Sequence, residues 1–101
     1  MLAEFSIIPI GKGESVGDQI AKVLQTVADS GLPYKANPMG TVVEGDWDQV
    51  MTLIKKCHNE MLKETGRLVT SITIDERPGN PNRIEEKIKS VEKRLGREVS
   101  K

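Results

Sequence analysis

The sequence has one cysteine and one histidine, and they are neighbours at positions 57 and 58. Their surroundings have a helical pattern, and consecutive helical residues point about 100° apart, so Cys57 and His58 do not form a nucleophile and base pair. A zinc-type site would need a second cysteine or histidine, which the chain lacks. We therefore predict a buried Cys57, a His58 at the edge of an apolar stripe, no catalytic residues and no metal.

Three glycines, Gly11, Gly13 and Gly17, lie between a predicted strand and a predicted helix, where a phosphate-binding loop would lie. Their spacing matches neither phosphate-loop motif, because Val16 stands where a dinucleotide fingerprint has its third glycine. A flexible turn is the preferred interpretation, although the start of the helix can still attract an anion.

Several residues near a predicted hairpin and the last predicted strand have side chains suited to ligand binding. These candidates are Asn37, Met39, Thr41, Glu44 and Asp75. Each also has a purely structural interpretation. Asn37 can form a turn, Thr41 favours strands, Glu44 can help to cap the helix that follows it, and Asp75 can pair with Arg77.

The composition favours binding or assembly over other kinds of function. The 101 residues suit one domain, residues 1–101, and the 15 basic and 15 acidic side chains leave no net charge to attract nucleic acid or a membrane. Aromatic residues make up 3%, too few for an RNA-stacking platform. The single cysteine and the absence of a signal-peptide pattern predict a cytoplasmic protein.

Hydrophobic spacing and turn residues predict seven elements. Capping boxes are expected at Ser15 with Asp18 and at Asp46 with Gln49, and Gly66 should end the second helix. The predicted strands are residues 2–10, 33–36, 40–44 and 67–76, and the predicted helices are residues 16–30, 46–66 and 84–95.

The order β-α-β-β-α-β predicts a ferredoxin-like α+β fold, with a four-stranded antiparallel sheet covered by two helices on one face and an extra C-terminal helix. Alternation directs Phe5, Ile7, Ile72 and Ile74 toward the helices. The opposite, open face then carries Glu4, Ser6, Ser71, Thr73 and Asp75. It also carries Ile8 and Ile10, so we expect a second subunit or the C-terminal helix to cover part of it.

The two later helices differ in character. The second should bury one apolar stripe, formed by Trp47, Val50, Ile54, Cys57 and Met61. Residues 80–101 carry seven basic and four acidic side chains. That excess favours packing of the third helix on the acidic body or on a neighbouring subunit, although a solvated helix face is the commoner outcome.

Three sequence blocks together resemble the thiamine-binding protein family of small ferredoxin-like proteins, which is related to the YkoF-like proteins. The most specific block is Tyr34 followed by residues 37–45, Asn-Pro-Met-Gly-Thr-Val-Val-Glu-Gly. Residues 7–11 and 72–77 give weaker support, and the likeness spans nearly the whole chain.

This resemblance implies a homo-oligomer, typically a dimer of dimers, that binds thiamine or its hydroxymethylpyrimidine moiety at or near subunit contacts without catalysing a reaction. An aminopyrimidine offers a donor beside an acceptor, which Ser6, Asn37 or Thr41 can match. Tyr34 can stack on the ring with Met39 beside it. Either Glu44 or Asp75 can offset the positive thiazolium.

Two other functions remain open at this point. An ACT-like regulatory or assembly module would bind another metabolite or none. An enzyme would need Glu44 or Asp75 with a raised pKa in a closed pocket that His58 also faces.

Overall fold

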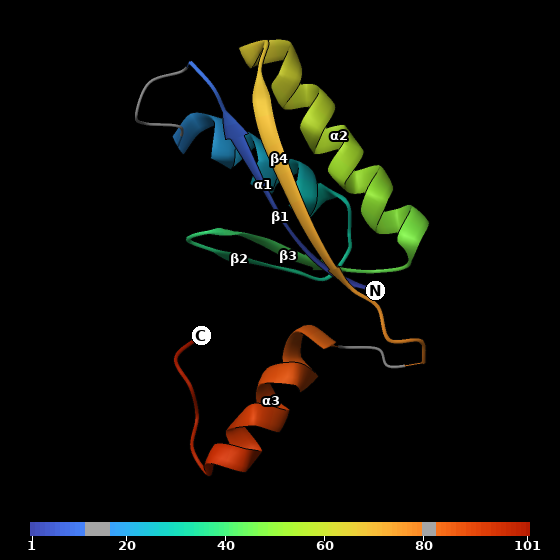
Figure 1. The fold of residues 1–101 in the computed structure, drawn as a ribbon, viewed down its shortest axis with the longest axis vertical. Coiled ribbons are helices and arrows are strands. Elements are labelled where there is room, and N and C mark those ends of the chain that lie inside the picture. The colour runs from blue at the N-terminus through green and yellow to red at the C-terminus, as the bar shows by residue number, and fades with distance from the viewer. Residues whose placement is uncertain (12–16, 80–82) are drawn as a thin grey trace.

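The chain alternates strands and helices in the predicted order (Figure 1). The structure is a computed structural model, and it describes residues 1–11, 17–79 and 83–101. The elements are β1 (Leu2–Pro9), α1 (Gly17–Asp29), β2 (Tyr34–Asn37), β3 (Gly40–Glu44), α2 (Trp47–Thr65), β4 (Leu68–Asp75) and α3 (Arg83–Leu95). The expected cap at Ser15 lies outside the described residues.

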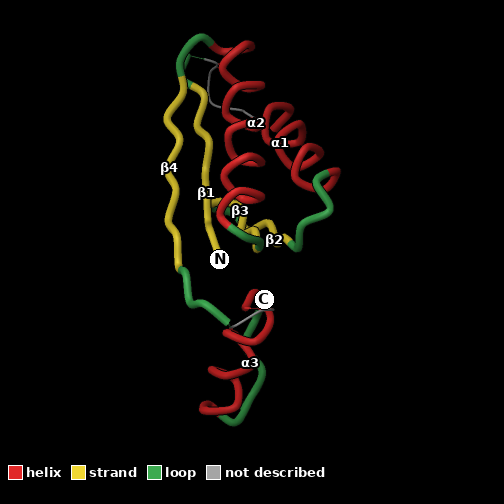
Figure 2. The backbone as a smooth tube through the Cα atoms, turned by 90° about the vertical axis from the view of Figure 1, so that its right-hand side faces the viewer, coloured by secondary structure: helices red, strands yellow, loops and turns green. Residues whose placement is uncertain are grey.

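The four strands form one antiparallel sheet in the order β2-β3-β1-β4. Paired residues lie on the same face of the sheet. Phe5 of β1 pairs with Thr41 of β3 and with Ile72 of β4, so these three residues share a face. Figure 2 shows α1 and α2 on the same side of this sheet. The ferredoxin-like arrangement with one open face is therefore confirmed.

The core lies between the sheet and these two helices. Three residues of β1 are buried, namely Ala3, Phe5 and Ile7, while Glu4 between the first two and Ile8 after the last are exposed, as alternation predicts. Burial of a large apolar side chain contributes roughly 1.5–3 kcal/mol to the stability of the fold. This energy determines which face of β1 packs against the helices.

The second helix begins and ends where its sequence indicates. The Asp46 side chain accepts from the Gln49 backbone N–H, and the Gln49 side chain accepts in return from the Asp46 N–H. At the other end Gly66 has φ 72° and its N–H bonds to the Leu62 carbonyl. Both termini are thus satisfied by residues that lie close by in the sequence.

One core residue was predicted wrongly. Val50, Ile54, Cys57 and Met61 are buried, but Trp47 is 52% exposed. Leu53 is buried as well, so the centre of the buried face lies roughly 60° around the helix from Trp47. Trp47 instead lies on the same flank of α2 as His58, because their separation of eleven residues makes about three helical turns.

The edge strand β4 is only partly covered on its helix side. Ile72 and Ile74 face the helices as predicted but remain 39% and 37% exposed. His58 marks the contact between α2 and this strand, because its Nδ1 lies 2.7 Å from the Thr70 hydroxyl oxygen. The predicted place of His58 at the edge of the apolar stripe is confirmed.

Candidate functional site

The C-terminal helix is attached to the body by Glu44, the last residue of β3. Its Oε2 accepts a hydrogen bond from the Arg83 backbone N–H at 2.9 Å, and its Oε1 accepts from the Ile84 N–H at 3.3 Å. These donors belong to the first turn of α3, which has no intrahelical acceptors for them. Glu44 therefore caps α3 from across the fold. The interpretation that it helps to cap the next helix is wrong, because Asp46 with Gln49 does so.

A second carboxylate, Asp75 at the end of β4, holds the same helix. It lies on the same face of the sheet as Glu44, on the other side of β1. The Asp75 Oδ2 accepts from Arg83 Nη2 at 2.6 Å and from Lys87 Nζ at 3.0 Å. The Arg83 guanidinium, followed by the Lys87 ammonium, holds the pKa of Asp75 well below its usual range. The alternative pairing of Asp75 with Arg77 is wrong. Both carboxylates expected to face a thiazolium instead bind α3.

Between α3 and the β2–β3 end of the open face lies a hollow of about 460 Å³, here called the α3 groove. Its apolar lining comes from the sheet and its β2–β3 turn on one side and from two half-buried isoleucines of α3, one helical turn apart, on the other. The lining residues are Leu2, Lys35, Ala36, Asn37, Pro38, Val42, Arg83, Ile84, Lys87, Ile88, Ser100 and Lys101.

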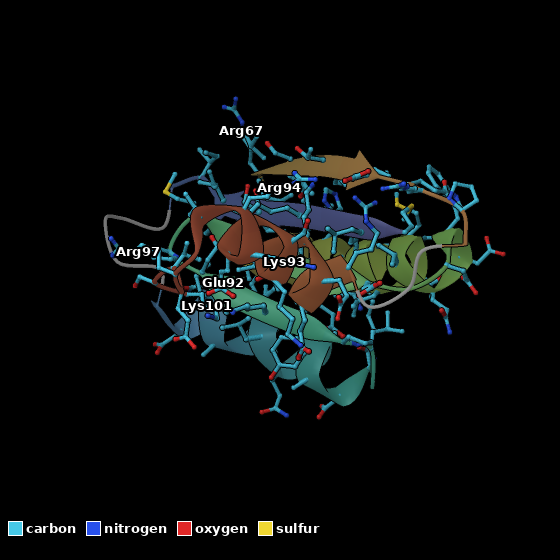
Figure 3. All side chains as sticks on the ribbon, turned by 90° about the horizontal axis from the view of Figure 1, so that it is seen from below. Arg67, Glu92, Lys93, Arg94, Arg97 and Lys101 are labelled. Carbon is cyan, nitrogen blue, oxygen red and sulfur yellow. The ribbon has the colours of Figure 1, made fainter. Side chains whose placement is uncertain are left out.

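The tail after α3 folds back along the helix, and its residues Ser100 and Lys101 line the groove. Glu92 Oε2 accepts from the Val99 N–H at 2.8 Å and from Lys101 Nζ at 2.7 Å. Figure 3 shows Glu92 and Lys101 close together, viewed from the α3 end of the molecule. The Lys101 contact, followed by the Val99 N–H, lowers the pKa of Glu92.

Four of the predicted binding residues, Ser6, Asn37, Glu44 and Asp75, lie on the open face, but only Asn37 lines the groove. Its Oδ1 accepts from the Met39 N–H at 2.9 Å, which confirms its role in the turn, and its Nδ2 donates to Glu4 Oε2 at 3.2 Å. Ser6 lies further along β1, opposite Ser71 of β4.

The other three candidates lie elsewhere. Thr41 is 7% exposed and pairs with Phe5 on the helix face, and Tyr34 pairs with Val43 on that same face. Met39 is 84% exposed in the turn between β2 and β3. The seven candidates are therefore not brought together in one pocket of the chain.

The sequence did not identify most of the groove as a binding surface. Ile84 and Ile88 belong to a narrow apolar stripe on a helix that is otherwise highly charged, and such a stripe is the signal that α3 has a partner. Lys35 could have been found from alternation, because it lies two residues before Asn37 on the same face of β2.

The half of the open face formed by β1 and β4 is left bare by α3, as Figure 2 shows. Ile8 and Val69 are paired partners there, with exposed fractions of 53% and 47%, and Ile10 is 39% exposed. The C-terminal helix contacts the β2–β3 end of the open face and does not cover Ile8 and Ile10, so cover of these side chains by a second subunit stays a prediction.

Other kinds of site find little support in the described part of the chain. Within residues 1–11, 17–79 and 83–101, no three or more His, Cys, Asp or Glu side chains are grouped so that they could hold a metal ion. No helix in these ranges has the length and apolar character needed to cross a membrane. The groove combines a ligand-sized volume with a mainly apolar lining and a few polar groups, which suits a small organic ligand.

These observations define a small ferredoxin-like α+β protein with a ligand-sized groove between its open sheet face and a terminal helix. A family model described as "Thiamine-binding protein" matches residues 3–92, and the chain belongs to this family.

Relatives and solved structures agree with this assignment. The chain is 41% identical to a UPF0045 protein of Methanocaldococcus jannaschii over 91 residues, which cover 90% of this chain and 91% of that protein. It is 33% identical to UPF0045 protein YqgV of Bacillus subtilis over 100 residues, which cover 93% of this chain and 96% of that protein. The crystal structure of the M. jannaschii protein superposes with a TM-score of 0.83 over 89% of this chain and 93% of that one.

A Thermotoga maritima structure, described as that of a proposed thiamine biosynthesis/salvage protein, has a TM-score of 0.79 at 22% identity and covers 89% of this chain and 96% of that one. At this identity the likeness concerns the fold.

Proposed function

We propose that this protein is a non-enzymatic binding protein for thiamine or its hydroxymethylpyrimidine moiety, and that the α3 groove is the site. Family membership over residues 3–92 is the observation that carries the ligand class. The groove supports its location, because its volume of about 460 Å³ lies within the range of ligand pockets, roughly 300–1,000 Å³.

The chemistry of the groove suits a small ring compound. Val42, Ile84 and Ile88 offer apolar contacts to the ring faces, while the Asn37 amide and the Ser100 hydroxyl offer polar contacts at its edge. Asn37 also has a fixed orientation, since both ends of its amide are already hydrogen bonded.

Binding without catalysis is supported by the state of the carboxylates. An acid catalyst near neutral pH needs a raised pKa, whereas the pKa of Asp75 is lowered by its partners Arg83 and Lys87. His58 contacts Thr70 on the helix face of the sheet and does not line the groove. Asp75 and His58 therefore give no support to the enzyme alternative.

We further propose that the chain works as a homo-oligomer whose subunits join through the open face, so that the groove lies near a subunit contact. Ile8 and Val69 are large apolar side chains exposed on that face, and a second copy would remove them from water. Light scattering should give a mass above that of one chain. Ile8→Asp should lower it, and Ile20→Asp, an exposed position on α1, should not.

Calorimetric titration with thiamine and with hydroxymethylpyrimidine tests the binding proposal. We expect heat of binding from at least one of them, and loss of binding in Ile88→Glu, which fills the groove with a charged side chain. Val91→Glu is the matched control, because Val91 is on the same helix and 43% exposed but does not line the groove. Absence of heat with both ligands at millimolar concentration would refute the proposal.

A further inference from the structure

The lining of the α3 groove is strongly asymmetric in charge. Four of its residues are cationic: Lys35 from β2, Arg83 and Lys87 from α3, and Lys101 from the tail. None of the lining residues that the structure describes is a carboxylate. Basic side chains from three separate segments therefore converge on one hollow, a more specific arrangement than a charged face of a single helix.

The carboxylates nearby offset this charge only in part. Asp75 holds both Arg83 and Lys87 through one oxygen, and Glu92 holds Lys101. Lys35 forms no ion pair within the described residues. Three of the four cations of the lining thus share two carboxylates, and the fourth, Lys35, has no ion-pair partner among the described residues.

Arg83 also has unused hydrogen-bonding capacity. Its side chain is only 11% exposed, and its Nη1 is buried without a hydrogen-bond partner in the described part of the chain. An unpaired buried donor is costly, and the residue that carries it lines the groove.

None of the described acidic residues near α3 lines the groove itself, and those closest to it, Glu4, Asp75 and Glu92, are hydrogen bonded to lining residues. Glu85 and Glu98 line an adjoining hollow of about 410 Å³, which shares Ile84, Ile88 and two lysines with the groove. A positively charged thiazolium in the α3 groove would therefore face cations. The carboxylates expected to stabilise it, Glu44 and Asp75, are already bound to α3.

We propose that the α3 groove selects an anionic ligand, a phosphate ester of a small heteroaromatic ring, over the uncharged or cationic parent compound. The apolar residues Val42, Ile84 and Ile88 would contact the ring, and the cations would hold the phosphate by charge-assisted hydrogen bonds. This inference rests on the proposed function, because family membership supplies the ring.

Paired titrations test the charge preference. The probes are thiamine and thiamine monophosphate, hydroxymethylpyrimidine and its phosphate ester, and inorganic phosphate alone. We expect each ester to bind about tenfold more tightly than its parent at low ionic strength, with the advantage shrinking in about 0.5 M salt because exposed charges are screened.

Substitution of one cation locates the effect. Lys35→Gln should weaken ester binding roughly threefold to tenfold, a larger change than in parent binding, so the preference for the ester should shrink. This position is chosen because Lys35 lies on a short edge strand and forms no ion pair with described residues, so folding should be preserved. Lys93→Gln, at an α3 position labelled in Figure 3 and absent from the groove lining, is the control and should change neither affinity.

The outcomes separate this inference from the proposed function. Equal affinity for ester and parent, or tighter binding of thiamine than of its monophosphate, would overturn the charge preference while leaving the proposed function in place. Inorganic phosphate binding as tightly as the esters would also overturn it, since the ring would then contribute nothing. No binding of any ring compound would remove the proposed function itself.

Discussion

Replacing Glu44 with alanine should loosen α3 while the rest of the fold stays intact. The change removes the acceptor of two backbone N–H groups, at 2.9 Å from Arg83 N and 3.3 Å from Ile84 N. Loss of a helix cap costs about 0.5–2 kcal/mol, typically about 1 kcal/mol. For an opening equilibrium, about 1 kcal/mol corresponds to a roughly fivefold rise in the open population.

This local effect is expected because α3 has little else to hold it. It has 13 residues, none of which is fully buried, and isolated helices of that length are marginal in water. Its attachment consists of the Glu44 cap, the Asp75 contacts and the half-buried Ile84 and Ile88. Opening of α3 should therefore occur well below the free energy of global unfolding.

Native-state amide hydrogen exchange is the suitable assay. In Glu44→Ala, α3 amides should exchange about fivefold faster, whereas the buried amides of β1 and α2 should be nearly unchanged. Asp46→Ala, which removes the cap of α2, is the contrasting variant and should act on the body instead. An equal acceleration throughout the chain, or unaltered exchange in α3, would refute the view that Glu44 caps an independently opening helix.

Three further expectations concern the effect of acid on Asp75, the substitution of Gly40 in the sheet and the reactivity of the Cys57 thiol. The pKa of Asp75 is lowered in the folded chain, so its contribution to holding α3 should be complete above about pH 4 and be lost below it. Circular dichroism should detect this loss of helical signal on acidification, and the loss should be smaller in Asp75→Asn. A Cβ at Gly40 would lie 2.9 Å from the Phe5 carbonyl oxygen, so Gly40→Ala should cost on the order of 1–3 kcal/mol in urea unfolding, unlike Gly17→Ala, where the Cβ meets nothing within 4 Å. Burial raises the pKa of the Cys57 thiol to about 11, so native protein at about pH 8 should resist a thiol reagent that reacts at once in urea.

The parts of the fold that could be predicted depend on short-range patterns. The Asp46 and Gln49 box spans four residues, and the face of each β1 residue follows from alternation alone. The β-α-β-β-α-β order then restricts the topology to the arrangement that is observed. The partial exposure of Ile72 was not predictable in the same way, since it depends on how far α2 reaches over an edge strand.

The candidate site was harder to predict because its contacts are long-range. Glu44 bonds to a backbone N–H 39 residues away, and no local spacing distinguishes that partner from the nearer helix. The two-residue turn between β2 and β3 pairs Asn37 with Gly40 and Ala36 with Thr41. Since paired residues share a face, Asn37 and Thr41 lie on opposite faces despite their closeness in the sequence.

The dependence of α3 on Glu44 and Asp75 also has a kinetic consequence. Its cap comes from β3 and its ion pairs from β4, which are brought into one sheet only by β1 between them. Pairing of the first strand with the last is the most distant contact in the sheet and is slow to form. In refolding, α3 should therefore become ordered only after β1 has paired with β4. The appearance of its helical signal should then report the last step of folding.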